Sequence, residues 1–464
     1  MARSALSAKP PAHAIPASSG WVAAAAIPLL FFLWPDFLWP DTSWPDILTP
    51  DTLLPDRPAL SARDSCNLYI LALFLSLALH ELLFLRIHNS PGTGLRFDWR
   101  NFTDPTCWQS YVVKLVGLAA SLGGLAVVYW AVELYRGDWY APFFATLSDH
   151  GGLILAVIVT NVTLAHFAML RPRDGLWHIG AFLLTLGRGD TDRDQITGHL
   201  LALTIKGFFI PLMYCYLVYD WEYLRDVDLT TLTDFPAIYA FLYRFLFFAD
   251  LSLVVVGYVF AARVLNSHIR WSENTMLGWV VCILCYAPFW QLFSRSYFDY
   301  FSPSYTWGNW LWDYPVAYGI WGTTILVLMA IYTMGTMRMG LRFSNLTYRG
   351  VAYGFPFNLS RHPQYITKNI TWWLIDIPFV ATDLATGFSN CLSLLGVNLI
   401  YLLRARCEER CLRRSPSYRH YERQIAKHGL LARLSRRQGE GQAKGQGGAP
   451  MQEAPRRRPD PRAK

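Results

Sequence analysis

The chain has 464 residues, of which 53% are hydrophobic, 16% aromatic and only 16% charged. So few charges cannot cover a soluble globule of this length, so the composition excludes an ordinary soluble enzyme and favours an integral membrane protein. The net charge of +8 comes from the end of the chain, because residues 404–464 hold 17 Lys and Arg against 6 Asp and Glu. A basic excess confined to one tail does not predict a nucleic-acid partner.

The first 65 residues form the first predicted unit. Within it, 21–34 (WVAAAAIPLLFFLW) is apolar over about fourteen residues, which is short for a membrane span and fits a signal-like region or a first anchor. Five tandem pentapeptides follow at 32–56, FLWPD FLWPD TSWPD ILTPD TLLPD. A proline at every fifth position prevents a regular helix and tryptophan favours the headgroup region, so we expect an extended strap at the membrane interface.

Nine apolar runs approach or reach the length of a membrane-spanning helix. They lie near 68–87, 111–135, 151–170, 200–219, 236–265, 277–294, 314–336, 368–382 and 386–403. We therefore predict an all-α, polytopic transmembrane bundle of about eight to ten spans. Residues 66–300 are expected to form an N-terminal bundle of unknown role, 301–430 a second membrane domain, and 431–464 a disordered basic tail.

Polar side chains interrupt the apolar runs of the first half. They are His80, Glu81, Lys114, Asn161, His166, Lys206, Arg244 and Asp250. Such residues are costly in a bilayer and are often functional. We favour structural roles for them, with lipid binding or substrate access as the alternative. Arg244 and Asp250 are six positions apart, too far round a helix to pair, so each should have another partner.

Neither the cysteines nor the clustered aspartates form a recognisable site. Cys282 and Cys285 make a CxxC inside an apolar run, where two small buried residues on one helix face are the simplest interpretation. The three alternate aspartates of 190–194 lack the glycine and distal glutamate of a calcium loop, so we expect a solvated turn. No metal site is predicted.

The stretch SRHPQY, residues 360–365, carries the first half of the candidate site. Proline is favoured at the first position of a helix because its missing N–H is not needed there, so Pro363 predicts a helix start. Ser360, Arg361 and His362 then stand at the helix entrance, where free backbone donors and the helix dipole suit a carboxylate. The alternative is a plain helix start whose basic side chains extend into the headgroups.

The second half is LLRARCEERCLRRSPSYRHYERQI, one apolar hairpin later. It contains Arg404, the acidic pair Glu408 and Glu409, and the tyrosines Tyr418 and Tyr421. Arg404 and Glu408 lie one helical turn apart, where the helix is expected to leave the bilayer. A carboxylate receptor on one helix and a carboxylate pair on the next could hold a zwitterion by both ends.

These motifs, in the order G-[FP]-P-[FY]-x-x-x-RHPxY, apolar hairpin, R-x-x-x-EE-x-x-L…Y-x-x-Y, resemble a known family. It is the isoprenylcysteine carboxyl methyltransferase superfamily of integral-membrane methyltransferases, which includes phospholipid N-methyltransferases. Sterol reductases share a related C-terminal pattern. The resemblance covers 314–425, about a quarter of the chain.

The resemblance implies a cytosol-facing pocket for S-adenosylmethionine, closed by the C-terminal helix, with a lipophilic or lipidated acceptor entering from the bilayer. The implied cofactor-binding residues are Arg361, His362, Tyr365, Glu408, Tyr418 and Tyr421, and the implied catalytic residues are Arg404 and Glu409. In these roles His362 and Tyr365 contact the amino-acid part of the cofactor. Glu408 or Glu409 contacts its ammonium group. Arg404 approaches the acceptor or the cofactor carboxylate.

Two other classes of function stay open. A membrane reductase that uses NADPH would need basic residues for the phosphates, and Arg410, Arg413 and Arg414 could supply them. A transporter or lipid-binding protein without enzymatic activity would instead use the N-terminal bundle. In each case the positive-inside rule predicts a cytoplasmic C-terminus and a cytoplasmic loop at 337–350, in an inner or plasma membrane.

Overall fold

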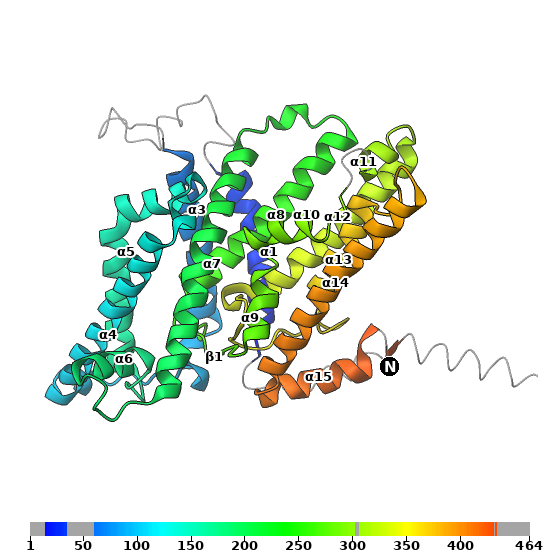
Figure 1. The fold of residues 1–464 in the computed structure, drawn as a ribbon. Coiled ribbons are helices and arrows are strands. Elements are labelled where there is room, and N and C mark those ends of the chain that lie inside the picture. Colours follow the sequence, from blue (N-terminus) through cyan, green and yellow to red (C-terminus); the bar gives the residue numbers. More distant parts are fainter. Residues whose placement is uncertain (1–13, 35–59, 302–305, 431, 434–464) are drawn as a thin grey trace, which may run out of the picture.

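The computed structural model describes residues 14–34, 60–301, 306–430 and 432–433, and helices dominate them (Figure 1). The α-helices are α1 (Ala17–Phe32), α3 (Ala62–Leu79), α4 (Pro105–Ala131), α5 (Ala141–Ala168), α6 (Gly175–Leu184), α7 (Arg193–Arg225), α8 (Phe235–Val259), α9 (Met276–Ile283), α10 (Phe289–Ser296), α11 (Trp307–Trp310), α12 (Pro315–Met339), α13 (Pro363–Asp376), α14 (Leu384–Leu412) and α15 (Pro416–His428). Strands β1 (Trp271–Ser272) and β2 (Thr347–Tyr348) pair antiparallel.

Short helical turns connect these elements. They are η2 (His80–Phe84), η3 (Ile87–Asn89), η4 (Pro91–Thr93), η5 (Trp99–Phe102), η6 (Glu133–Arg136), η7 (Asp138–Tyr140), η8 (Leu229–Thr231) and η10 (Gly340–Arg342). The predicted interfacial strap beyond its first three residues, and the predicted basic tail apart from residues 432–433, lie outside the described residues.

Seven helices of the described chain are long and apolar enough to cross a membrane. They are Ala62–Phe84, Pro105–Ala131, Asp138–Ala168, Arg193–Arg225, Phe235–Val259, Pro315–Arg342 and Leu384–Leu412. This is the pattern of a multi-pass helical membrane protein.

The number of such helices in the described chain is lower than the eight to ten spans predicted, because two of the apolar runs fold as shorter pieces. The run 277–294 is divided between α9 and α10, which have eight residues each. The run 368–382 is interrupted after the 14-residue helix α13, where Ile377 turns the backbone into the left-handed region with φ 35°. Hydropathy alone does not register either break.

Several helices begin with a capping side chain that is followed by a proline in the first turn. Asp104, Asp234 and Ser415 each accept a backbone N–H in the first turn of α4, α8 and α15. A cap supplies the acceptor that this turn lacks, and the proline removes a donor that would have no partner. Pro363 occupies the same place in α13, so the helix start predicted from SRHPQY is confirmed.

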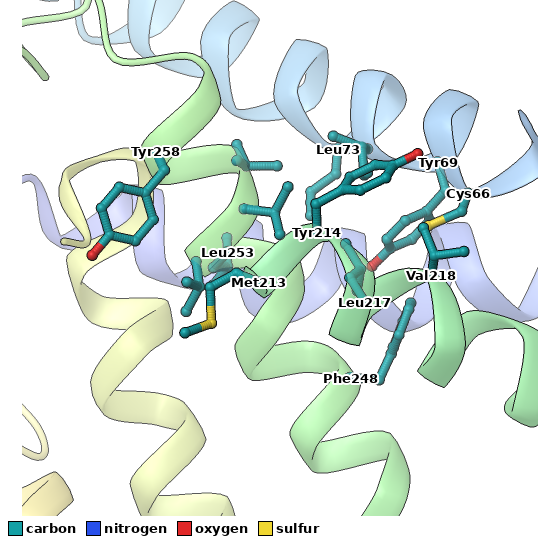
Figure 2. Packing of buried hydrophobic residues seen from close by; sticks show 14 of the residues in the cluster. Cys66, Tyr69, Leu73, Met213, Tyr214, Leu217, Val218, Phe248, Leu253 and Tyr258 are labelled. Carbon is teal, nitrogen blue, oxygen red and sulfur yellow. The ribbon is translucent and has the colours of Figure 1, made fainter. Parts of the chain in front are cut away.

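A buried apolar core joins α1, α3, α7 and α8, and Figure 2 shows part of it. Trp221 on α7 is fully buried, and the rings of Phe31, Tyr69 and Phe248 surround it at centroid distances of 5.7, 4.9 and 5.8 Å. Helix α1 also packs against α12. The apolar stretch at 21–34 therefore belongs to the core of the bundle.

The separated charges Arg244 and Asp250 each have another partner, as their spacing predicts. Arg244 Nε lies 2.5 Å from Asp220 Oδ1 on the neighbouring helix α7. Asp250 accepts a hydrogen bond of 3.1 Å from Tyr332 on α12. Both contacts join transmembrane helices, which is the structural role expected for them.

A third polar contact joins the two halves of the chain. Glu81, in the π-helical end of the first span, is fully buried and lies 2.6 Å from Arg342 Nη1, whose side chain is 2% exposed. Ser19 of α1 donates a hydrogen bond of 2.8 Å to the same carboxylate. The loop after α12 is therefore anchored to the N-terminal bundle by a buried ion pair.

The segment between α5 and α7 forms helix α6, which packs closely on α4. Gly117 and Gly180 face each other at the crossing, and a Cβ on either would collide with the backbone of the other helix. Lys114 Nζ lies 3.0 Å from Asp174 Oδ2 beside this crossing. Asp192 caps α7, so the aspartate cluster serves a helix start.

Candidate functional site

Residues of α12, α13, α14, α15 and the loop 340–350 line a cavity with a volume of about 170 Å³. Seven of the eight predicted site residues line it: Arg361, His362, Tyr365, Arg404, Glu408, Tyr418 and Tyr421. The eighth, Glu409, is buried and does not line the cavity. The fold therefore brings the two sequence motifs to one place. Figure 1 shows α15 lying across the end of the bundle, below α14.

Glu409 joins the two motifs by direct contact. Its Oε1 lies 3.0 Å from His362 Nε2 and 3.1 Å from Arg361 Nη1, and its Oε2 lies 3.0 Å from Arg413 Nη2. The anion expected at the entrance of α13 is thus the protein's own carboxylate. Arg361 and His362 hold the wall of the cavity together, because their side chains already have a partner in Glu409.

Glu408, the neighbouring acid, is placed differently. Tyr365 donates a hydrogen bond of 2.5 Å to its Oε1. Arg404 Nε and His362 Nδ1 are both 3.8 Å from the carboxylate, beyond hydrogen-bond distance. Glu408 lines the cavity with its side chain 25% exposed, so it is the acid that a bound ligand can reach.

Arg404 is enclosed by aromatic rings. Its guanidinium carbon lies 5.1 Å from the ring centre of Tyr365, 5.2 Å from Tyr286 and 5.9 Å from Tyr401. Its Nη2 donates to Asn345 Oδ1 at 2.8 Å, while its buried Nε has no hydrogen-bond partner. Of these neighbours, Tyr365 was already predicted as a site residue, and Tyr401 could have been found because it precedes Arg404 by one helical turn. Nothing in the sequence pointed to Tyr286 or Asn345.

Arg349 is a cavity residue that the sequence analysis did not select. Its guanidinium donates to three backbone carbonyls, those of Ser267 at 2.6 Å, Gly257 at 2.8 Å and Phe343 at 2.6 Å. Its Nη2 is buried and has no partner. Burial lowers the pKa of this guanidinium to about 9. From the sequence, Arg349 belonged only to a basic loop, which indicated membrane orientation and not a site.

The β1–β2 pair holds this loop in place, and it was not predicted. The rings of Trp271 and Tyr348 stack with their centres 4.2 Å apart. Trp271 Nε1 donates to the carbonyl of Cys411 at 3.2 Å, and the hydroxyls of Tyr348 and Ser415 lie 2.7 Å apart. The loop is therefore fastened to the junction of α14 and α15.

Helix α15 closes one side of the cavity. Tyr421 donates a hydrogen bond of 2.8 Å to the carbonyl of Phe357. Glu422 lies 2.5 Å from Arg413 and 2.7 Å from Arg361. The hydrogen bonds from Arg413 hold the pKa of the Glu422 carboxyl below its usual value. Arg361, just before α13, and Arg413, at the end of α14, thus both hold α15 through Glu422.

Lys368 of α13 also lines the cavity. Its Nζ lies 5.5 Å from the ring centre of Tyr332 and 5.4 Å from that of Trp372. Its neighbour Asn369 bonds Asn398 instead, as packing between α13 and α14. The inner end of the cavity is therefore aromatic and cationic.

Within the described chain, no group of three or more metal-ligating side chains is found. Cys282 and Cys285 are buried free thiols, as predicted, but Cys285 lies in the turn after α9 and not on the same helix. The comparisons with known proteins add no family: no family model, curated protein or solved structure matches the chain. The chemistry of the cavity is therefore argued from its own residues.

Proposed function

We propose that this chain is an integral-membrane methyltransferase that uses S-adenosylmethionine and acts on a lipophilic acceptor. The observation that carries the proposal is the single cavity lined by residues of both motifs, with an accessible acid, an aromatic wall and a buried arginine. Methyltransferases of the superfamily that the motifs resemble use such a pocket for this cofactor.

The residues present fit the cofactor's charges. Glu408, with one oxygen bonded to Tyr365, would accept from the ammonium group. The unpartnered Nε of Arg404 would donate to the carboxylate. The electron-rich faces of Tyr365 and Tyr401 would favour the sulfonium cation. This assignment differs from the predicted one, because Arg361 and His362 hold Glu409 rather than a ligand.

The bound cofactor would supply an electrophilic methyl group, which the acceptor takes up while the carbon–sulfur bond breaks and its electron pair stays on sulfur. The protein's part is to hold donor and acceptor in line and to exclude water. A carboxylate or thiolate acceptor needs no base. An amine acceptor does, and Glu408 is placed to take that proton, whereas Glu409 already contacts three basic side chains.

The NADPH reductase has less support from the geometry. Arg410 donates to Thr275 and Arg414 to Asn274, and Arg413 is held by two glutamates. None of these three arginines lines the cavity. A transporter or lipid-binding role for the N-terminal bundle is the third candidate, and a ligand-binding experiment separates all three.

The experiment is binding of labelled S-adenosylmethionine and of NADPH to the purified full chain in a neutral detergent. We expect S-adenosylmethionine to bind, and Glu408→Gln to weaken it about 10- to 100-fold, since a hydrogen bond to a charged group contributes about 1.5–3 kcal/mol. The exposed Glu222 provides the control, Glu222→Gln. Binding of NADPH alone contradicts the proposal, and binding of neither favours the transporter.

The acceptor is identified by adding methyl-labelled cofactor to membranes that contain the protein and extracting the labelled molecule. Label in a lipid or a lipidated peptide supports the proposed acceptor class. The positive-inside rule places the site at the cytoplasmic face, with the C-terminus on the same side. A reporter fused to the C-terminus tests that orientation.

A further inference from the structure

Basic side chains outnumber acidic ones on the cavity wall. Within the described chain, no carboxylate oxygen lies within 4.0 Å of a charged nitrogen of Arg349 or Lys368, and the closest one to Arg404 is at 3.8 Å. An unpaired buried charge is destabilising by several kcal/mol. The cavity therefore favours a ligand that brings negative charge.

Four buried donor atoms on this wall have no partner. They are Nη2 of Arg349, Nδ2 of Asn345, Nε of Arg404 and the hydroxyl of Tyr418, on residues that are 3%, 5%, 5% and 4% exposed. A buried donor without an acceptor costs about 1–3 kcal/mol, so native proteins seldom keep several of them together. All four belong to residues that line one cavity, which indicates acceptor atoms supplied by a ligand.

Arg349 and Asn345 are fixed before any ligand binds. Three carbonyls hold the Arg349 guanidinium, and the N–H of Asn345 donates to Tyr258 at 2.7 Å. Between them Leu346 adopts a left-handed conformation with φ 57°, which costs about 1–2 kcal/mol for a residue with a side chain. Such strain is retained where it positions functional groups.

The cavity is also long enough for more than one group. Along α12 its lining runs from Met339 back to Tyr332, and it continues past the end of the helix to Arg342. The seven-residue separation within the helix alone spans about 10 Å at 1.5 Å per residue. If the cofactor's single carboxylate uses Arg404, as in the proposed function, then Arg349 and Asn345 are left for another anion.

We propose that Arg349 and Asn345 form an oxyanion subsite, which takes the carboxylate or phosphate group of a second ligand distinct from the cofactor. Arg349 Nη2 and Asn345 Nδ2 each donate one hydrogen bond to this group, and the guanidinium supplies the opposite charge. Only the identity of the first ligand rests on the proposed function. The subsite itself follows from the unpartnered donors.

Asn345→Asp is the decisive variant. It keeps the side-chain oxygen that accepts from Arg404 and replaces the free donor by an acceptor with negative charge. Arg349→Gln removes the positive charge, but it also removes hydrogen bonds to three backbone carbonyls that hold the loop, so it is the secondary variant. Arg423→Gln, at an exposed position of α15, is the control. Thermal unfolding of each purified full-length variant checks that it is folded.

The probes are inorganic phosphate, hexadecyl phosphate, palmitate and the neutral hexadecanol, with S-adenosylmethionine titrated separately. We expect Asn345→Asp to weaken binding of an anionic probe at least about tenfold and to leave hexadecanol unchanged. S-adenosylmethionine should lose less affinity than the anionic probes, because the new carboxylate contacts Arg404 only on the side away from the cofactor's Nε contact. An effect on inorganic phosphate identifies a free anion as the ligand. An effect confined to the two anionic amphiphiles identifies a lipid-like headgroup.

Unchanged binding of every anionic probe in Asn345→Asp overturns the subsite. Weakened S-adenosylmethionine binding alone also overturns it, because the donors would then serve the cofactor's own carboxylate. If S-adenosylmethionine binds to no variant and not to the unmodified protein, while the anionic probes respond as expected, the subsite stands and the methyltransferase proposal fails. Should Arg349→Gln not fold, Asn345→Asp decides the question by itself.

Discussion

His362 Nε2 and Glu409 Oε1 lie 3.0 Å apart, although 47 residues and an apolar hairpin separate them in the chain. This contact closes the cavity wall between α13 and α14. The same carboxylate is 3.1 Å from Arg361. Glu409 is therefore a positioning residue, which acts on a ligand through the basic side chains around it.

Replacing His362 or Glu409 should abolish most methyl transfer without affecting membrane insertion. Because the two side chains contact each other, the double variant His362→Ala with Glu409→Ala should be hardly worse than either single variant. We expect a coupling energy of about 0.5–3 kcal/mol, as for residues in one network. The measurement is methyl transfer to a demonstrated acceptor, with kcat and KM determined for all four proteins. Independent, additive losses would show that the contact does not matter for the site.

Tyr365→Phe should weaken S-adenosylmethionine binding about tenfold and leave the fold intact. The change removes the hydroxyl that donates to Glu408 at 2.5 Å and keeps the ring beside Arg404. Hydrogen bonds to charged groups contribute about 1.5–3 kcal/mol. Titration of the labelled cofactor measures the effect. The control is Tyr297→Phe, because Tyr297 is 75% exposed. Equal affinities in both variants would remove Glu408 from the cofactor site.

Glu81→Gln should destabilise the whole bundle, because it leaves the buried Arg342 without the negative charge that lies 2.6 Å away. Breaking a buried pair costs about 3–5 kcal/mol. We expect a lower unfolding temperature in detergent, and weaker ligand binding as well, since Arg342 lines the cavity. Glu222→Gln again serves as the exposed control. An unfolding temperature within experimental error of the unmodified protein would mean that the pair does not couple the two halves.

Acid should loosen α15 from the cavity. The hydrogen bonds from Arg413 lower the pKa of Glu422 in the folded protein. The stabilisation of α15 by this contact is therefore complete above the pKa of an unfolded glutamate, about 4.3. It is lost as the pH falls through the lower pKa of the folded protein. Ligand binding should thus be steady from about pH 5 to 8 and weaken below about pH 4.

Glu422→Gln tests this dependence. The variant cannot form the charged contact at any pH, so its affinity should be lower at neutral pH and should change less on acidification. The measurement is cofactor affinity from pH 4 to 8 in parallel for both proteins. A Glu422→Gln profile that overlays that of the unmodified chain would show that the clamp is not what acid releases.

Much of the architecture was predictable, because it depends on local patterns. Apolar runs indicated membrane-spanning helices, and Pro363 marked the start of α13. The six-residue spacing of Arg244 and Asp250 excluded a pair. The two breaks in the apolar runs were missed, since Ile377 and the end of α9 interrupt helices at residues that hydropathy scores as membrane-like.

The candidate site divides in the same way. The sequence by itself determined which residue types gather, because motif spacing places Arg361, His362, Arg404, Glu408 and Glu409 at two helix ends that a hairpin brings together. It did not determine which acid pairs and which faces the cavity, since neighbouring residues on a helix point in different directions. Only the tertiary structure decided that Glu409 contacts basic side chains and that Glu408 lines the cavity. It also decided that the loop held by the short strands β1 and β2 brings Arg349 and Asn345 to the same cavity.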